Sequence, residues 1–186
     1  MNIYEDYLSY MSDNQDFIEK MLETNSSIYY VLSDVIKVTD YIYRYQCDNE
    51  EIEEEIEEIF EIGFGFIANV LSQLNVYYNN YFDKNMEVFN YYSELMLYFV
   101  YIEDYLEYLK SEEILTDDVE KLLNGMLDKI DNIIVNKKPF DKVFTSSLDA
   151  TMDELKVVTP DYKPVYNVFR LIVEELQIED EIAQEE

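Results

Sequence analysis

The chain has 186 residues, of which 42 are acidic and 13 are basic, and its formal net charge at pH 7 is −29. It has no histidine and a single cysteine, Cys47, which excludes an intramolecular disulfide, zinc sites built on cysteine or histidine, and histidine-dependent catalytic triads. Apolar residues, counted with all 10 phenylalanines and 19 tyrosines, make up 48% of the chain, too much for a disordered acidic chain. With three glycines and three prolines, long helices joined by short loops are expected.

The N-terminal part of the chain is predicted to form three helices. The first covers about residues 2–11, and the second follows Ser12, which forms a capping box with Gln15. The segment TNSS at 24–27 ends the second helix and caps a third, which extends from about 27 to 46.

The most acidic segment of the sequence is 50–61, where eight of twelve positions are glutamate. We expect Asp48 or Asn49 to cap a helix that begins with these glutamates and continues to about residue 81. Apolar residues at helical spacing would form its core-facing stripe: Ile52, Ile56, Ile59 and Phe60. Five pairs of glutamates would then stand four positions apart, at a total cost of roughly 1 to 2.5 kcal/mol.

Two glycines, Gly63 and Gly65, fall in the apolar part of this helix. Each costs about 1 kcal/mol relative to alanine in a helix interior, so we expect a kink or a close packing contact there. The longest apolar runs, FGFIANVL and LMLYFVYI, are shorter than the roughly 18 to 20 residues of a membrane span. The N-terminus carries acids where a secretion signal would carry bases, so the sequence predicts a cytoplasmic protein.

Residues 85–110 are predicted to form the central helix. Six large residues recur at spacings of four and three and so share one face: Tyr91, Leu95, Tyr98, Ile102, Tyr105 and Leu109. Charge is sparse here, with six acids and two bases in 63–111 against 17 acids and three bases in 1–62. We therefore expect the middle of the chain to form the core and its two ends to carry the electrostatic field.

The rest of the chain is predicted to form three more helices, each with its own capping residue. The first is expected to be capped by Thr116 and to end near residue 135, and the second to be capped by Ser146 or Ser147 and to end near residue 156. The third is expected to be capped by Thr159, to have Pro160 as its first helical residue and to end near residue 182. No alternating apolar stretch bounded by hairpin turns indicates a strand. We predict a single all-α domain over 1–186, of about six to seven helices, with a possible subdomain seam near 110–116.

Carboxylates in the glutamate segment have the spacing of one kind of metal site. Glu54-x-x-Glu57 and Glu55-x-x-Glu58 resemble half of the E-x-x-E…E-x-x-D pattern of all-α MazG-like nucleotide pyrophosphohydrolases. That resemblance implies a Mg²⁺-dependent hydrolase acting on nucleotides, which suits an ion that prefers oxygen ligands. The downstream half of the pattern is missing, so we expect no metal, no cofactor and no catalytic residue, and keep the hydrolase as an alternative.

The same glutamates could instead imitate a nucleic-acid backbone. Duplex DNA carries one charge per about 1.7 Å of axis, and an α-helix rises about 1.5 Å per residue. A mostly acidic helix can therefore compete for the basic groove of a nucleic-acid enzyme. The acidic, helical character resembles phage-encoded DNA mimics that block restriction or CRISPR enzymes. The partner-binding residues expected in this segment are Glu50, Glu51, Glu53, Glu54, Glu55, Glu57 and Glu58.

A second candidate surface mixes tyrosines with acids on the outer edge of the central helix. Tyrosine buries a ring while offering a hydroxyl, and its ring can bind arginine through a cation–π contact. The residues of this group are Tyr101, Glu103, Asp104, Tyr105, Glu107 and Tyr108. Weaker candidates in the first and last helices are Glu5, Asp6, Glu174, Glu175 and Glu179.

These features lead us to expect a non-enzymatic acidic inhibitor of a basic partner, such as a nuclease, of the anti-CRISPR or anti-restriction kind. Nucleic acid and anionic membranes would be repelled, so we expect it to bind neither. A phage-encoded inhibitor of this kind would act in the host cytoplasm. Three alternatives stay open: an immunity protein for a basic nuclease toxin, the Mg²⁺-dependent hydrolase, and an acidic scaffold or homo-oligomer subunit whose tyrosine-rich helices bury against another copy.

Overall fold

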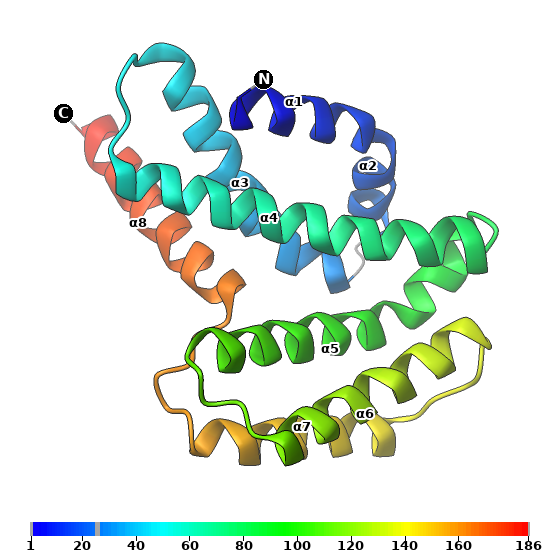
Figure 1. Ribbon diagram of the computed structural model, residues 1–186. Coiled ribbons are helices and arrows are strands. Elements are labelled where there is room, and N and C mark those ends of the chain that lie inside the picture. Colours follow the sequence, from blue (N-terminus) through cyan, green and yellow to red (C-terminus); the bar gives the residue numbers. More distant parts are fainter. Residues whose placement is uncertain (1, 25–26, 186) are drawn as a thin grey trace. The chain divides into compact units, whose positions relative to one another are not determined.

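The computed structural model describes residues 2–24 and 27–185, with side chains as far as Leu176. Over that part the chain is all-α, as predicted, with eight α-helices, one short π-helix and no strand. In chain order these are α1 Ile3–Asp13, α2 Gln15–Glu23, α3 Ser27–Asp48, α4 Glu54–Val76, the π-helix η1 Tyr77–Tyr81, α5 Met86–Ser111, α6 Asp117–Val135, α7 Lys142–Val157 and α8 Val165–Glu185 (Figure 1). The count is slightly above the six to seven expected.

The chain divides into two compact units. Unit 1 extends to Asn75 and resumes at Val165, so it holds α1, α2, α3, nearly all of α4, and α8. Unit 2 is Val76–Pro164 and holds η1, α5, α6 and α7. The turn at 110–116, where a seam was expected, joins α5 to α6 within unit 2. The single-domain organisation stays a prediction.

Unit 1 is held together where α3, α4 and α8 meet. Helix α8 packs along α3, and Gly63 of α4 faces both helices. A Cβ atom at Gly63 would collide with Thr39 Oγ1 and lie 3.0 Å from Phe169 Cε1. Thr39 is buried, and its hydroxyl donates to Val35 O at 2.7 Å. The close contact expected at the glycines is thus confirmed at Gly63, whereas a Cβ atom at Gly65 would have no described neighbour within 4 Å.

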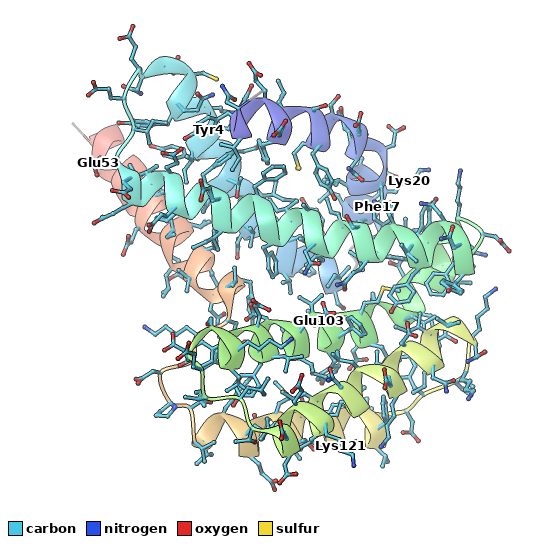
Figure 2. The ribbon with its side chains drawn as sticks, in the orientation of Figure 1. Tyr4, Phe17, Lys20, Glu53, Glu103 and Lys121 are labelled. Carbon is cyan, nitrogen blue, oxygen red and sulfur yellow. The ribbon has the colours of Figure 1, made fainter. Side chains whose placement is uncertain are left out.

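Aromatic rings fix α1 against α3 and α4. Tyr7 is 1% exposed, and its ring centroid lies 5.3 Å from Phe60 and 5.4 Å from Phe64, both on α4. The Tyr7 hydroxyl donates to the carboxylate of Asp40 on α3. Tyr4 lies beside the first turns of α4, with its ring 4.6 Å from Phe60 (Figure 2). Burial of these rings therefore places α1 next to the acidic start of α4.

The boundary between α1 and α2 differs from the prediction. Helix α1 extends through Ser12 to Asp13, so Ser12 does not cap the second helix. Asn14 takes the N-cap position of α2, and within the described chain its side chain makes no capping bond. Its amide donates to Tyr10 O at 2.9 Å, and its carbonyl oxygen accepts from Asn75 Nδ2 of α4 at 2.8 Å. A tertiary contact has replaced the expected local cap.

Unit 2 is built around α5, as predicted for the central helix. Helices α6, α7 and η1 pack against it. Of the predicted stripe, Leu95, Ile102, Tyr105 and Leu109 are buried. Two members of the stripe are not buried, since Tyr91 is half exposed and Tyr98 is half-buried. At the start of α5 the core is formed instead by Phe89 and Tyr92, which lie outside the predicted stripe.

The predicted caps of α6 and α8 had opposite outcomes. Thr116 is confirmed, since its side chain accepts from Val119 N at 3.3 Å at the start of α6. Thr159 is not a cap, because Pro160 lies in a turn and α8 begins only at Val165, directly after the last proline of the chain.

The predicted cap of α7 was also wrong. Ser146 and Ser147 lie inside this helix, which begins at Lys142. Asp141 is the N-cap, and its carboxylate accepts from Phe144 N at 3.1 Å. Aspartate and serine are both favoured N-caps, and here Asp141, directly after Pro139-Phe140, caps the helix in place of the serine pair.

The helical stretch Glu54–Tyr81 is long and apolar enough to cross a membrane by length and composition alone, and in the described part of the chain it is the one such stretch. Its most apolar window has a mean hydropathy of 1.3. Counting only unbroken apolar runs missed it, because isolated polar residues interrupt the runs without much lowering the average. Phe60, Ile67, Leu71 and Leu74 are each at most 2% exposed and belong to the core of unit 1, but only 33% of the most apolar window is buried.

Candidate acidic binding surface

The predicted glutamate surface begins outside a helix. Helix α3 continues to Asp48, and Asn49 closes it by donating its side-chain amide to Tyr45 O at 2.8 Å. Helix α4 begins only at Glu54. The expected cap at Asp48 or Asn49 is therefore wrong, because Asn49 ends one helix instead of starting the next. Three expected binding residues precede the helix: Glu50, Glu51 and Glu53 (Glu53 is labelled in Figure 2).

The later start of α4 changes the local electrostatics. Glu54, Glu55 and Glu57 lie in the first turn, where the helix dipole stabilises each carboxylate by roughly 0.3 to 1 kcal/mol. Of the five expected like-charge pairs, only Glu54/Glu58 and Glu57/Glu61 have both members inside α4. The repulsive cost therefore falls to roughly 0.4 to 1 kcal/mol, and the acids at this helix start are tolerated locally.

Four glutamates share one side of α4. At about 100° per residue they fall within an arc of about 100°. The set, called here the acidic face, is Glu54, Glu57, Glu58 and Glu61, and all four are exposed. Within the described part of the chain, none of the four has a hydrogen bond or ion pair to another side chain. On the opposite side Phe60 is buried and Ile56 and Ile59 are half-buried, as the stripe predicted.

Two members of the acidic face, Glu57 and Glu61, lie near Tyr4 of α1. Burial raises the pKa of the Tyr4 phenol, and the nearby carboxylates of Glu57 and Glu61 raise it further. Glu5 and Asp6 follow Tyr4 on α1 and are exposed. The helix that carries Tyr4 therefore adds two exposed acids to unit 1, beside the carboxylates of α4 that act on the Tyr4 phenol.

The candidates on α8 contribute less. Glu174 and Glu175 are exposed. The Glu174 carboxylate lies 3.9 Å from Arg170 Nε, an exposed pair of the kind that adds little stability and partly neutralises the charge. Glu179 lies outside the residues whose side chains are described.

Tyr105, from the second predicted group, belongs to the core of unit 2. It is 1% exposed, and its hydroxyl donates to Leu155 O at 3.1 Å and is hydrogen-bonded to Thr159 Oγ1 at 2.8 Å. Its ring lies 4.9 Å from that of Tyr162, whose hydroxyl donates to Asp104 at 2.6 Å. The expectation of an exposed edge is thus corrected at Tyr105, and Asp104 already accepts a bond within its own unit.

The other members of the second group differ in exposure. Tyr101, Glu103 and Tyr108 are half-buried, whereas Glu107 is exposed (Glu103 is labelled in Figure 2). Burial, followed by the carboxylate of Glu112, raises the pKa of the Tyr108 phenol. This group belongs to unit 2 and the acidic face belongs to unit 1, so the two are separate candidate surfaces.

Tyrosines act as partners for several acids, a feature that sequence reasoning missed. The pairs are Tyr7–Asp40, Tyr77–Asp131 at 2.8 Å, Tyr98–Asp149 at 2.8 Å and Tyr162–Asp104 at 2.6 Å. Burial first, and then the bond to the carboxylate, raises the phenol pKa of Tyr7, Tyr77 and Tyr98. The partners are 33 to 58 positions apart, so local patterns could not identify them. The one available signal was composition, because tyrosines outnumber the 13 basic residues.

In the part of the chain that the structure describes with side chains, the carboxylates do not gather as a metal site would require. Among the described residues, no group of three or more acidic or cysteine side chains is placed to hold an ion. The half pattern at Glu54-x-x-Glu57 is therefore not completed by another described element.

Unit 2 has a shallow depression of about 400 Å³, lined by Ile133, Pro139, Phe140, Asp141 and Phe144. Its carboxylate, from Asp141, already caps α7. The lining is otherwise apolar, and it offers no pair of titratable groups for acid–base chemistry among the described residues.

No family model, no curated protein and no solved structure matches this chain. Function must therefore be argued from the charge, burial and spacing of the chain's own residues.

Proposed function

We propose that the chain is a non-enzymatic inhibitor that binds a basic, nucleic-acid-binding surface of a partner enzyme. The binding surface is the acidic face of α4 together with the three glutamates that precede the helix. One observation carries the proposal, namely the division of charge between the units. Unit 1 has 24 acidic and 4 basic residues, a net charge of −20, whereas unit 2 has 18 and 9, a net charge of −9.

The spacing of the acidic face supports a phosphate-like role. From Glu54 to Glu61 the helix rises about 10.5 Å, so its four carboxylates are spaced at roughly 3.5 Å on average along the helix axis. One strand of duplex DNA presents a phosphate per about 3.4 Å of axis. Lysines and arginines arranged to grip consecutive phosphates could therefore grip these carboxylates. The match is to one strand instead of both, because the acids before Glu54 are not helical.

The charge of the whole chain supports a basic partner. A net charge of −29 attracts cationic surfaces over a distance and accelerates association at low salt. The same field opposes direct binding to nucleic acid. A basic nuclease toxin presents similar chemistry to a nuclease that acts on foreign DNA, so both kinds of enzyme are reasonable partners.

A cleavage assay with matched variants tests the proposal. Restriction-type, CRISPR-type and toxin nucleases are each incubated with the chain before labelled DNA or RNA is added. The test variant neutralises the acidic face with Glu54→Gln, Glu57→Gln, Glu58→Gln and Glu61→Gln. The control variant neutralises four exposed acids of unit 2, with Glu94→Gln, Glu112→Gln, Glu113→Gln and Glu154→Gln.

Both variants change the net charge by the same amount, so they separate local recognition from bulk charge. We expect the wild-type chain and the control to inhibit at least one nuclease, and the test variant to inhibit at least about tenfold more weakly. Equal inhibition by both variants would show that the acidic face is not the contact surface. No inhibition of any basic nuclease by the wild-type chain would overturn the proposed function.

A further inference from the structure

The outward face of α3 carries three exposed aromatic residues. Tyr30, Tyr41 and Tyr45 are 63%, 52% and 41% exposed. At about 100° per residue they fall within roughly 60° of arc, on the side of the helix away from its buried residues. Large aromatic rings of this kind are typical of binding surfaces, because they bury much area and still offer a hydroxyl.

Charged residues of both signs alternate with these tyrosines. Asp34, Lys37, Arg44 and Asp48 lie on the same face, and Lys37 and Arg44 are two of the four basic residues in unit 1. This face therefore differs from the acidic face of α4, which carries one sign of charge. We call the set of seven residues the tyrosine face: Tyr30, Asp34, Lys37, Tyr41, Arg44, Tyr45 and Asp48.

The tyrosine face is complementary to itself when a second copy is reversed. For two antiparallel α3 helices related by a two-fold axis level with residue 39, position n of one lies level with position 78 − n of the other. Asp34 then lies level with Arg44 of the second copy, about 7.5 Å along the helix from the axis. Lys37 lies level with a Tyr41 ring, which suits a cation–π contact. The axis repeats both contacts, as expected for an isologous interface.

We propose that the tyrosine face is a self-association surface, where α3 packs antiparallel against α3 of a second copy. The face is about 27 Å long and one helix wide, and each copy carries a charge of −29. The small size of the face limits affinity, because stable interfaces bury about 800 Å² per partner. The negative charge of each copy limits it further, because the two copies repel each other. We therefore expect the dimer to be a weak one. This association is independent of binding by the acidic face of α4.

Sedimentation velocity of the full chain over about 1 to 500 μM, with charge-swap variants, tests this arrangement. Arg44→Asp makes the chain more negative and Asp34→Arg makes it less negative. Both place like charges opposite each other, so each is expected to raise the dimer dissociation constant at least about tenfold. The double variant D34R/R44D restores opposite charges and the original net charge. It is expected to return the constant to within about threefold of wild type.

Two further variants separate the α3 contact from the effects of net charge. Arg170→Asp on α8 changes the net charge as Arg44→Asp does and should leave dimerisation within about threefold of wild type. Tyr41→Ala removes an exposed ring and no charge, and should weaken the dimer at least about tenfold; circular dichroism checks that each variant is folded. A chain that stays monomeric at every concentration overturns the proposal. So does a set of variants in which affinity simply follows net charge, since Asp34→Arg would then strengthen the dimer.

Discussion

Unit 1 and unit 2 are built from similar materials and differ mainly in charge. Both are helical, with 9 and 10 tyrosines respectively, and both contain a bond from a tyrosine to an aspartate. Unit 1 has six acids for each base, whereas unit 2 has two. Unit 2 shows that tyrosine-rich helices pack into a unit at a much lower negative charge. The surplus acids of unit 1 are therefore not a requirement of this kind of packing.

The two cores also close differently. Unit 1 depends on a missing side chain at Gly63, which lets α4 approach Thr39 of α3 and Phe169 of α8. Unit 2 depends on a buried polar group, the hydroxyl of Tyr105, which holds the segment at Leu155 and Thr159. Neither core includes a residue of the acidic face. Substitutions in either core can therefore test its packing without changing the surface charge.

The largest effect is expected from Gly63→Ala. The added methyl group would collide with the buried Thr39, so we expect the free energy of unfolding to fall by about 1 to 3 kcal/mol. Urea titration followed by circular dichroism measures it. Gly65→Ala on the same helix and Gly125→Ala in unit 2 meet no described atom within 4 Å and should instead add about 0.5 to 1 kcal/mol. Equal effects at Gly63 and Gly65 would contradict the packing described for unit 1.

A slightly smaller loss is expected from Tyr105→Phe. It removes one hydroxyl from the core of unit 2 and leaves the buried Thr159 without that partner, at a cost of about 1 to 2 kcal/mol. Tyr98→Phe is the matched control, because its hydroxyl bonds Asp149 at an exposed site, and it should cost at most about 0.5 kcal/mol. Urea titration measures the free energy of unfolding of both variants. Equal losses would contradict the expectation that the buried bond of Tyr105 contributes more than the exposed bond of Tyr98.

Alkaline pH should destabilise the fold through its buried phenols. The pKa of Tyr7 is raised in the folded chain, so both states are protonated below about pH 10 and the unfolded state loses its proton first above it. Stability is therefore fully present below about pH 10 and falls as pH rises further. Tyr7→Phe should make the decline between about pH 9 and 11 shallower, by about 1 kcal/mol at pH 11. An unchanged slope in urea titrations would mean that Tyr7 does not titrate differently in the two states.

The smallest effect on stability is expected from neutralising the acidic face. The four glutamine substitutions at 54, 57, 58 and 61 remove two repulsive pairs and also lose favourable first-turn charges. These changes oppose each other, so the free energy of unfolding should change by at most about 0.5 kcal/mol. A loss above about 2 kcal/mol in urea titration would show that these acids serve the fold of unit 1 itself.

Much of the fold could be predicted because helix periodicity and strong local caps are written in consecutive residues. Thr116 illustrates this, since the cap and the first turn it stabilises are three residues apart. Ser12 and Thr159 had equally good local signals and still failed. Asn14 is bonded by Asn75 of α4, and the hydroxyl of Thr159 is used by Tyr105 of α5. Contacts between distant residues occupy Asn14 and Thr159, and a capping pattern of a few consecutive residues does not contain that information.

Local patterns predicted the exposure of the candidate site's glutamates, but not the start of α4 or the burial of Tyr105. The exposure of Glu54, Glu57 and Glu58 followed from the apolar stripe, because the core-facing side of a helix fixes its outer side. The late start of α4 could not be predicted, because an asparagine at position 49 suits the end of α3 and the start of α4 equally well. Only the bond from the Asn49 amide to Tyr45 O shows that this residue ends α3. Tyr105 was misplaced because a tyrosine at helical spacing suits a core or an edge, and its partners lie about 50 residues away.

The most direct test of the central claim is the salt dependence of binding to an inhibited nuclease. Dissociation constants are measured from about 50 to 200 mM salt for the wild-type chain, the acidic-face variant and the unit 2 control. We predict that affinity falls steeply with salt for the wild type and the control, and that the acidic-face variant binds more weakly with a clearly shallower slope. The same slope and affinity for the acidic-face variant and the control would contradict recognition through the acidic face of α4.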